Sequence, residues 1–383
     1  MHITHLISNL EPGGAETSLA TLVEATQGSN IRHTVVSLLP RGVLRGRLER
    51  TGASVIELEG GRGLRGALSL PDLRNAVRKN DPDVLQCWMY HANIAGSVLK
   101  MIGTIGCPVI WGIRQGARNI WLDRLTTRAA ILAGVPFSRL PERIVYNSEH
   151  SAEEHERLGY AIGPRVIIPN GIDCNRFQPR PAMRDRLRAE LGLHRDTVLI
   201  GRVARYAPMK DYPTALHALA SVINGLPDAH LAVIGPSLNG ESAQIVSLAQ
   251  ELGCGAHVHI LRRRLDIENF YPALDLLISS SKANEGFPNS VAEALACETL
   301  VVSTSVGESL LVQAGSHRLV RPEQPEELSR AILDLLSVAP EAKAILAQQG
   351  RDFILKNFSQ ESFASAFAKL WQETCAEWRT KRH

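Results

Sequence analysis

Short β-branched runs alternate with longer amphipathic segments along the chain, and this alternation constrains the fold more than any other feature. Such alternation predicts βαβ units and therefore parallel sheets covered by helices. In the first half the expected strands are residues 2–8, 33–38, 54–58, 84–88, 109–113, 143–147 and 166–168. In the second half they are residues 198–203, 230–235, 258–261, 274–279, 300–303 and 319–320. Helical patterns between them include residues 16–24, 72–79, 214–223, 243–251, 291–297 and 326–335.

The alternation is interrupted once, near residue 175. Residues 168–173 are rich in turn formers, and residues 178–181 carry two prolines that cannot continue a helix or a central strand. A length of 383 residues also favours two or three domains. We therefore expect two doubly wound, Rossmann-like α/β domains that face each other across a ligand-binding cleft. The expected boundaries are residues 1–175, residues 176–357, and a C-terminal helix at 358–383 that crosses back to the first domain.

Composition narrows the class of protein. Hydrophobic residues make up 44% and charged residues 21%, which is typical of a globular chain and not of a disordered or disulfide-scaffold protein. The net charge of +3 is too small to predict a nucleic-acid partner. Arginines nevertheless cluster at residues 41–50, 62–65, 262–264 and 379–382. These clusters form either a solvated face or a surface for phosphates or an anionic membrane.

The six cysteines are scattered and form no C-x-x-C motif, which indicates reduced and mostly buried thiols. The first ten residues form a strand-like run rather than a secretory signal. The most apolar stretch, residues 98–113, is interrupted by Lys100 and Pro108 and is too short to span a bilayer. We therefore expect a cytoplasmic protein, with peripheral association at the inner face of the membrane as an open alternative.

Two motifs resemble known sites but lie in the wrong context. Residues 61–66 match G-x-G-x-x-G, yet they follow the third expected strand rather than the first, so NAD binding is not predicted. Asp81-Pro82-Asp83 could hold a metal beside a diphosphate, but it precedes a strand and is better explained as a turn. The chain has no P-loop and no zinc-type histidine spacing. We therefore expect no metal.

Two loops that follow strands carry features suited to an anionic ligand. Gly13 and Gly14 follow the first strand and precede a helix, whose amino end favours a phosphate, although a plain βα turn is an equally good interpretation. Arg205 and Lys210 follow the first strand of the second half, and Asp211 is expected to cap the next helix. Two cations beside a helix amino end suit a diphosphate, because arginine binds it as a fork and lysine as a point charge.

The most specific segment runs from residue 279 to residue 297 and carries two glutamates eight positions apart. Glu285 lies in the loop after a strand, and Glu293 is expected in the first turn of the following helix. Ser290 and Glu293 also fit a capping box, which would not prevent Glu293 from accepting a sugar hydroxyl. His91 follows another strand of the first half and is either a polar group of the cleft or an ordinary loop histidine.

Taken together, these segments resemble family 4 of the retaining, nucleotide-sugar-dependent glycosyltransferases, which have the GT-B fold. The resemblance covers nearly the whole chain, and its last block is similar to the family's E-x7-E signature. It rests on Gly13–Glu16, Tyr146–Ser148, Val166–Asp173 with Phe177 and Pro179, Arg205 through Lys210 and Asp211, Glu285–Asn289, and Glu293.

The resemblance implies a role for each matched residue. Arg205 and Lys210 would neutralise the departing diphosphate, Glu285 would contact the donor sugar or stabilise charge at its anomeric carbon, and Glu293 would bind the ribose hydroxyls. With His91 added as the candidate polar group of the cleft, the catalytic set is Glu285, His91, Arg205 and Lys210. The donor-binding set is Gly13, Gly14, Arg205, Lys210, Arg263, Glu285, Gly286, Phe287, Asn289, Ser290, Val291 and Glu293.

The implied reaction moves a hexosyl or N-acetylhexosaminyl group from a nucleotide diphosphate, with UDP favoured, to a polysaccharide or lipid-linked glycan acceptor, without metal or other cofactor. The alternatives are a sugar-nucleotide epimerase or glucan phosphorylase of the same fold, or a non-catalytic protein that binds sugar nucleotides. The chain departs from the family at three positions. Trp88 stands near the usual histidine, and Glu298 and Glu308 replace small residues.

Overall fold

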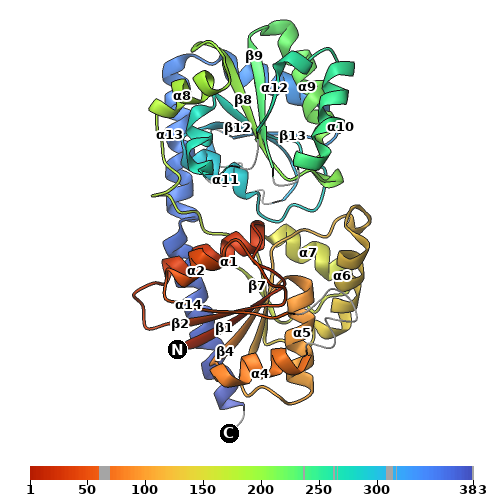
Figure 1. Cartoon of the computed structure of the whole chain (residues 1–383), viewed down its shortest axis with the longest axis vertical. Helices are drawn as coiled ribbons and strands as arrows, with labels where there is room; N and C mark the ends of the chain where they lie inside the picture. The colour runs from red at the N-terminus through yellow and green to blue at the C-terminus, as the bar shows by residue number, and fades with distance from the viewer. Residues whose placement is uncertain are drawn as a thin grey trace. The chain divides into compact units, whose positions relative to one another are not determined.

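The computed structural model describes most of the chain, which divides into two compact α/β units (Figure 1). Unit 1 comprises Met1–Gly171 together with Gln360–His383, and unit 2 comprises Ile172–Ser359. Two parallel sheets confirm the doubly wound architecture expected from the alternation of strands and helices. The described residues are 1–59, 70–235, 238–261, 264, 266–307, 314–315 and 317–381, without the side chains of residues 238–241.

Unit 1 is built on a seven-stranded parallel sheet with the order β3-β2-β1-β4-β5-β6-β7. The strand order reverses between β1 and β4, which pair directly with Leu6 opposite Cys87. The loops after these two strands therefore begin at neighbouring points of one sheet edge, where open α/β sheets bind ligands. The strands are β1 (His2–Ile7), β2 (Arg32–Ser37), β3 (Ser54–Glu57), β4 (Val84–Trp88), β5 (Val109–Ile113), β6 (Arg143–Tyr146) and β7 (Arg165–Ile167).

Helices cover both faces of this sheet. Leu19 of α1 and Phe367 of α14 are buried on one face, and Val77 of α4 and Leu99 of α5 are buried on the other. Because both faces are covered, a central strand such as β5 is buried at every position and shows no polar alternation. The helices are α1 (Gly14–Ala25), α2 (Arg45–Glu49), α4 (Leu70–Asn80), α5 (Met89–Met101), α6 (Leu125–Phe137), α7 (Glu149–Arg157) and α14 (Gln360–Thr380), with the 3-10 turn η1 (Ile120–Leu122).

The last helix, α14, packs on the sheet of unit 1 although it comes from the far end of the sequence. The buried Trp371 donates its indole N–H to Gln86 Oε1 of β4 at 3.1 Å. Arg143 at the start of β6 binds both carboxylate oxygens of Glu377 at 2.6 and 2.7 Å. The helix thus covers the part of the apolar sheet face that lies beside α1, and it supplies a hydrogen-bond donor to the buried Gln86.

A chain of buried hydrogen bonds with one consistent direction crosses the same face. Trp88 Nε1 donates to His5 Nδ1 at 3.2 Å, so His5 Nε2 carries the proton and donates to His33 Nδ1 at 2.9 Å. His33 Nε2 then donates to Thr26 Oγ1 at 2.8 Å, and Thr26 donates to the Leu22 carbonyl at 2.8 Å. Both imidazoles are neutral. Burial lowers the pKa of His33 to about 4 and holds that of His5 well below its ordinary value.

Unit 2 contains a six-stranded parallel sheet with the order β10-β9-β8-β11-β12-β13. The strand order again reverses at a neighbouring pair, β8 and β11, where Ile200 lies opposite Leu276. The strands are β8 (Val198–Val203), β9 (Ala229–Ile234), β10 (Val258–Leu261), β11 (Leu276–Ser279), β12 (Leu300–Thr304) and β13 (His317–Val320). The helices are α8 (Ala182–Glu190), α9 (Tyr212–Gly225), α10 (Leu238–Glu251), α11 (Asn289–Ala296), α12 (Pro325–Ser337) and α13 (Pro340–Asn357). The described part of unit 2 also contains the 3-10 turns η2 (Pro208–Lys210), η3 (Gly255–His257), η4 (Ile267–Asn269) and η5 (Tyr271–Ala273).

Two apolar cores fill the faces of the second sheet. One core contains residues of α8, α11 and α13, and the other contains residues of α9, α10 and α12. Every strand expected from the sequence is present, but several helices start earlier than expected, and α10 begins at Leu238 instead of residue 243. The six cysteines are buried and form no disulfide. Among the described helices, none combines the length and apolar composition needed to cross a membrane.

Acidification is expected to destabilise unit 1. The unfolded chain protonates His33 near the ordinary pKa of 6.5, whereas the folded chain does so only near 4. Stability that is fully present above about pH 6.5 is therefore lost as the pH falls toward 4. Urea unfolding followed by tryptophan fluorescence measures this loss in unit 1 alone, because all five tryptophans belong to it, namely Trp88, Trp111, Trp121, Trp371 and Trp378.

The His33→Gln variant keeps a donor and an acceptor but cannot titrate, so its urea midpoint should depend less steeply on pH than that of the parent chain. His217→Gln, at an exposed histidine of unit 2, is the matched control and should keep the parent slope. A parent midpoint that stays constant between about pH 7 and pH 4.5 would contradict the neutral histidine chain.

Candidate functional site

Two loops of unit 2 leave the carboxyl ends of β8 and β11, the neighbouring strands at which the sheet order reverses. The first loop carries Arg205 and Lys210, and the second carries Glu285. The N–H of Lys282 donates to the carbonyl of Met209 at 2.8 Å, which joins the two loops through their backbones. The structure thus brings together charged residues that the sequence separates by 75 positions.

An ion pair between Lys210 and Glu285 is the centre of this site. Lys210 Nζ donates to Glu285 Oε1, and Ser281 Oγ donates to the same oxygen at 2.6 Å. Both side chains are largely buried, at 20% and 13% exposure. Burial by itself would raise the pKa of Glu285, but the charge and hydrogen bond of Lys210, the Ser281 hydroxyl and the charge of Arg205 lower it below its ordinary value. Glu285 is therefore ionised at neutral pH.

Arg205 differs from Lys210 because it is exposed. Its Nη2 atom contacts the sulfur of Met209 at 3.7 Å, while its charge acts on Glu285. The site therefore contains one carboxylate, one cation that neutralises it, and a second cation that faces solvent. An arrangement of this kind has a positive charge to offer an anion at the sheet edge.

A second, fully buried arginine fixes the turn that carries Lys210. Arg202 Nη1 donates to Ser280 Oγ at 2.6 Å, and its Nη2 donates to the Lys210 carbonyl. Ser280 Oγ in turn donates to the Asp211 carbonyl at 2.6 Å. Asp211 has a left-handed backbone (φ 47°) and caps α9 by accepting the N–H of Thr214 at 3.3 Å, as the sequence predicts. Arg202 was missed, although a charged residue inside the apolar run of β8 signals a partner.

Two glycines allow the backbone to pass close to these loops. Gly307 follows β12 with φ +90°, and a Cβ there would lie 2.8 Å from Glu285 Cβ and 3.0 Å from the Gly286 carbonyl oxygen. At Gly235, which follows β9, a Cβ would lie 2.0 Å from the Ala204 carbonyl oxygen. Any other residue would push the loops away from their present positions. Neither glycine is marked as a site residue by the sequence alone.

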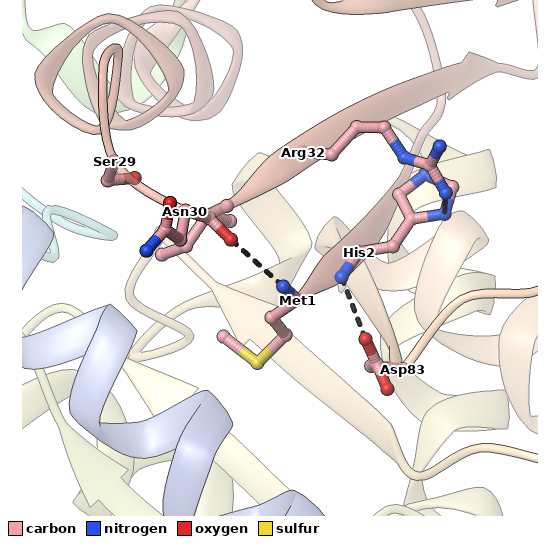
Figure 2. A pocket seen from close by; sticks show the side chains of 7 residues that line it. Met1, His2, Ser29, Asn30, Arg32 and Asp83 are labelled. Carbon is pink, nitrogen blue, oxygen red and sulfur yellow. Dashed lines mark hydrogen bonds between the residues drawn. The ribbon is translucent and has the colours of Figure 1, made fainter.

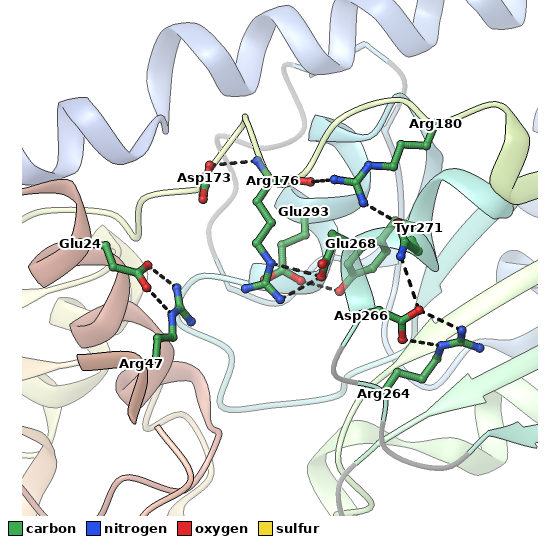
Figure 3. A network of polar contacts seen from close by, with 11 residues as sticks. Glu24, Arg47, Asp173, Arg176, Arg180, Arg264, Asp266, Glu268, Tyr271 and Glu293 are labelled. Atoms are coloured by element: carbon green, nitrogen blue, oxygen red, sulfur yellow. Dashed lines mark hydrogen bonds and ion pairs between the residues drawn. The ribbon is translucent and has the colours of Figure 1, made fainter. Parts of the chain in front are cut away.

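Glu293 lies in a polar network beside this sheet edge (Figure 3). The buried Tyr271 donates its hydroxyl to Glu293 Oε2 at 2.5 Å. Nearby, Arg176 binds Glu268 Oε2 through Nε at 3.2 Å and Nη2 at 2.9 Å. Burial, together with the Glu293 carboxylate, keeps the pKa of Tyr271 well above its ordinary value, so the phenol remains a donor. Tyr271 thereby fixes one oxygen of Glu293, a contact that the sequence analysis missed.

The capping box expected from Ser290 and Glu293 is wrong. Helix α11 begins at Asn289, and its N-cap is Pro288, whose carbonyl accepts the N–H of Val291 at 3.0 Å. Ser290 is therefore the second residue of the helix rather than its cap, and Glu293 is the fifth residue and lies beyond the first turn. The shift arises because the proline supplies the non-helical cap position itself and Ser290 adopts helical geometry.

Other residues of the donor set lie around the same segment. Phe287 is buried and packs against Phe358 with ring centroids 5.2 Å apart, and Val291 is fully buried in the same core. Gly286 is buried as well, so these residues can offer a ligand their backbone rather than their side chains. Residues 61–66, 262, 263, 308 and 382, and with them Arg263, Glu308 and the G-x-G-x-x-G motif, lie outside the described residues.

In unit 1, the site residues that the sequence predicts follow β1 and β4. Gly13 is the N-cap of α1, which begins at Gly14 rather than at residue 16, and both glycines are exposed. His91 is the third residue of α5 and is exposed, so it lies on a helix and not in a loop. Trp88 is buried and donates its indole N–H to His5.

The Asp81–Asp83 motif lies at the opposite, amino end of the sheet. Asp83 Oδ2 accepts the N–H of His2 at 2.8 Å, and Asp83 Oδ1 accepts Arg379 Nη2 at 2.9 Å. Asp83 lines an open cavity of about 360 Å³ together with Met1, His2 and Arg32 (Figure 2). In the part of the chain that the structure describes, no three metal-ligating side chains are grouped to hold a metal ion. The motif therefore joins elements of unit 1 as a structural turn.

Comparison with known proteins identifies the class. Residues 12–176 match the family model described as Glycosyltransferase Family 4, and residues 183–372 match the model described as Glycosyl transferases group 1. The two matches together span nearly the whole chain. The chain therefore belongs to the group 1, family 4 glycosyltransferases, and its two Rossmann-like units are those of the GT-B fold.

Two similar sequences are D-inositol 3-phosphate glycosyltransferases. The protein from Saccharomonospora viridis is 29% identical over 250 residues, which are 62% of this chain and 57% of that protein. The protein from Rhodococcus erythropolis is 30% identical over 247 residues, which are 62% of this chain and 55% of that protein. The chain thus matches little more than half the length of these curated relatives.

Solved structures show the same fold at lower sequence identity. HepE from Anabaena, in complex with UDP and glucose, has a TM-score of 0.85 and 22% identity, covering 97% of this chain and 100% of that chain. A sucrose-phosphate synthase from Thermosynechococcus elongatus has a TM-score of 0.81 and 18% identity, covering 98% of this chain and 100% of that chain.

Replacing Gly307 by alanine should destabilise unit 2 for two reasons. The new Cβ would clash with Glu285 and with the Gly286 carbonyl oxygen, and alanine disfavours the left-handed backbone of position 307. Gly253→Ala is the matched control, since Gly253 has φ +72° but no atom within 4 Å of the added Cβ. Urea unfolding followed by far-UV circular dichroism should give Gly307→Ala a free energy of unfolding about 1–3 kcal/mol lower than Gly253→Ala. Equal values for the two variants would show that the Glu285 loop does not need this close approach.

Proposed function

We propose that this chain is a retaining glycosyltransferase that moves a hexosyl or N-acetylhexosaminyl group from a UDP-sugar to a hydroxyl of a polysaccharide or lipid-linked glycan, without a metal ion. The observation that carries the proposal is the Lys210–Glu285 pair beside Arg205, where β8 and β11 meet. The fold shared with HepE, which was solved with UDP and glucose, supports the choice of donor.

The two cations suit the leaving group of this reaction. When the bond between the anomeric carbon and the diphosphate oxygen breaks, negative charge grows on the diphosphate, and cations already in place stabilise it without reorganisation. Arg205 is exposed and can bind phosphate oxygens as a fork, while Lys210 supplies a fixed point charge. In this role arginine, lysine and the amino end of α9 take the place that a divalent metal ion has in other transferases.

The ion pair implies an exchange of partners when the donor binds. Lys210 is neutralised by Glu285, so a diphosphate that reaches Lys210 competes with that carboxylate. The Ser281 hydroxyl and the charge of Arg205 lower the pKa of Glu285 as well, although Lys210 lowers it more. The carboxylate is then free to accept hydroxyls of the donor sugar, or to stabilise the positive charge that develops at the anomeric carbon. The backbone N–H groups of residues 286, 287, 289 and 290 are the proposed donors to sugar and phosphate.

The remaining roles follow the same layout. Glu293, held by Tyr271, would bind the ribose hydroxyls, and the backbone around Leu261 and Arg263 would line the base pocket. Gly13 and Gly14 of unit 1 would face the diphosphate and the acceptor. His91 is the candidate polar group on the acceptor side, where it would orient the attacking hydroxyl.

The first test uses Lys210→Met and Glu285→Gln. A thermal-shift panel of UDP-, GDP- and ADP-sugars identifies the donor, since a bound donor raises the unfolding temperature. Release of the nucleotide diphosphate from that donor then measures turnover. Both variants should lower kcat by about 10²–10³. Lys282→Met, which removes a lysine of the same loop that pairs with Glu323 at 3.3 Å, should stay near the parent value.

A chelator should leave turnover unchanged, and the anomeric configuration of the product, read by NMR, should match that of the donor. Parent-like turnover in either Lys210→Met or Glu285→Gln would reject the site assignment. A product of inverted configuration would reject the retaining reaction.

The second test concerns Tyr271, which we place as a positioning residue for Glu293. Tyr271→Phe removes the 2.5 Å hydrogen bond and keeps the ring in the core, so the KM for the donor should rise about tenfold while kcat changes little. Tyr206→Phe is the control, because it removes a hydrogen bond of the same length to the exposed Gln244. Equal KM values in both variants would contradict the role of Tyr271.

A further inference from the structure

Helix α6 of unit 1 presents a row of apolar side chains to solvent. Leu125 is 72% exposed and Leu132 is 48% exposed. Ala129, Ala133 and Pro136 are exposed as well. These positions recur every three or four residues and so form one stripe along the helix, where a surface helix ordinarily has polar side chains. The opposite side of α6 is also apolar and packs into the core through Ile131.

An exposed tryptophan extends the stripe at its amino end. Trp121 lies in the turn before α6 and is 72% exposed, and the guanidinium of Arg128 lies 4.5 Å from the centre of its ring. At the other end, the N–H of Ala161 donates to Ser138 Oγ, the residue that ends α6, at 2.9 Å. This contact places the 67% exposed Ile162 beside the same surface.

Within residues 118–139, nearly all of the charged side chains have one sign. Residues 118–139 contain four arginines and a single acid, Asp123, which is buried and accepts a hydrogen bond from Gln115 at 3.0 Å. The helix itself contains no acidic residue. The arginines are Arg118, Arg124, Arg128 and Arg139.

The arginines nearer the start of the chain are different, because acids neutralise two of them. Arg45 binds Glu49 at 2.9 Å and Glu57 at 3.1 Å, and Arg47 binds Glu24 at 2.6 Å. An anionic surface would therefore be attracted less to residues 41–50 than to the arginines around α6.

We propose that this surface, which we call the α6 face and define by Trp121, Leu125, Leu132, Arg118 and Arg124, docks on an anionic lipid bilayer. Tryptophan is suited to the headgroup region, the leucines to the acyl boundary, and arginines to lipid phosphates. In unit 1 the helix lies outermost on the sheet face that α5 also covers (Figure 1). The proposal does not rest on the sugar-transfer reaction.

Charge decides between a bilayer and a second copy of the chain. A symmetric dimer through this face would bring the same arginines of both copies together, with no exposed acid in residues 118–139 to neutralise them. An anionic bilayer supplies the opposite charge across the whole face.

Sedimentation of the full chain with vesicles tests the proposal. The chain should bind phosphatidylcholine vesicles that contain phosphatidylglycerol, bind pure phosphatidylcholine weakly, and lose binding as salt rises from about 0.1 to 0.5 M. Leu125→Gln with Leu132→Gln should lower partitioning about tenfold or more, and Arg118→Gln with Arg124→Gln should also lower it about tenfold or more. The controls Ile345→Gln and Arg195→Gln, at exposed positions of unit 2, should bind as the parent does.

Brominated lipids identify the residue that enters the bilayer. They should quench the fluorescence of Trp121, which is the strongly exposed tryptophan, whereas Trp88, Trp111 and Trp371 are buried. Trp121→Phe should keep vesicle binding and lose the quenching. Parent-like vesicle binding in the Leu125/Leu132 double variant would overturn the proposal. If light scattering shows a dimer for the parent chain and a monomer for this double variant, the α6 face serves self-association instead.

Discussion

The ion pair between Lys210 and Glu285 depends on where two strands end, and the candidate site depends on that pair. Parallel strands deliver their following loops to one edge, and β8 and β11 are neighbours because the sheet order reverses between them. Removing water from a partly buried ion pair costs free energy, and further hydrogen bonds to the two charged groups are needed to offset that cost. Ser281 completes the carboxylate, and Arg202 with Ser280 holds the turn behind the lysine. The positions of the charged groups therefore depend on the backbone geometry of the two loops as much as on side-chain contacts.

The sequence predicts the parts of this arrangement that follow from local rules. Strand ends place Arg205, Lys210 and Glu285 at one edge, and Asp211 before Tyr212-Pro213 predicts the cap of α9, as observed. The same local reasoning fails for α11. Ser290 and Glu293 have the spacing of a capping box, but Pro288 already provides the cap, so the serine enters the helix. A capping motif is ambiguous when two nearby residues, here Pro288 and Ser290, can each occupy the N-cap position.

The remaining contacts join segments that are far apart in the sequence, and no local pattern indicates them. Tyr271 reaches Glu293 across 22 positions, and the hydrogen bond between Trp88 and His5 spans 83. Gly307 matters because of what lies next to it, which only the folded sheet determines. Charged or polar residues within apolar strands, such as Arg202 and His5, are the signal that could have revealed part of this set, since such groups need buried partners.

The return of α14 to the first sheet has a consequence for the order in which the chain is synthesised. Unit 2 is continuous in sequence, whereas unit 1 needs residues 360–380, which leave the ribosome after the whole of unit 2. Until then the indole of Trp371 cannot satisfy Gln86, and the apolar face that Phe367 covers stays open to water. The sheet of unit 1 therefore stays partly uncovered until α14 is synthesised, whereas unit 2 can already close both of its apolar cores.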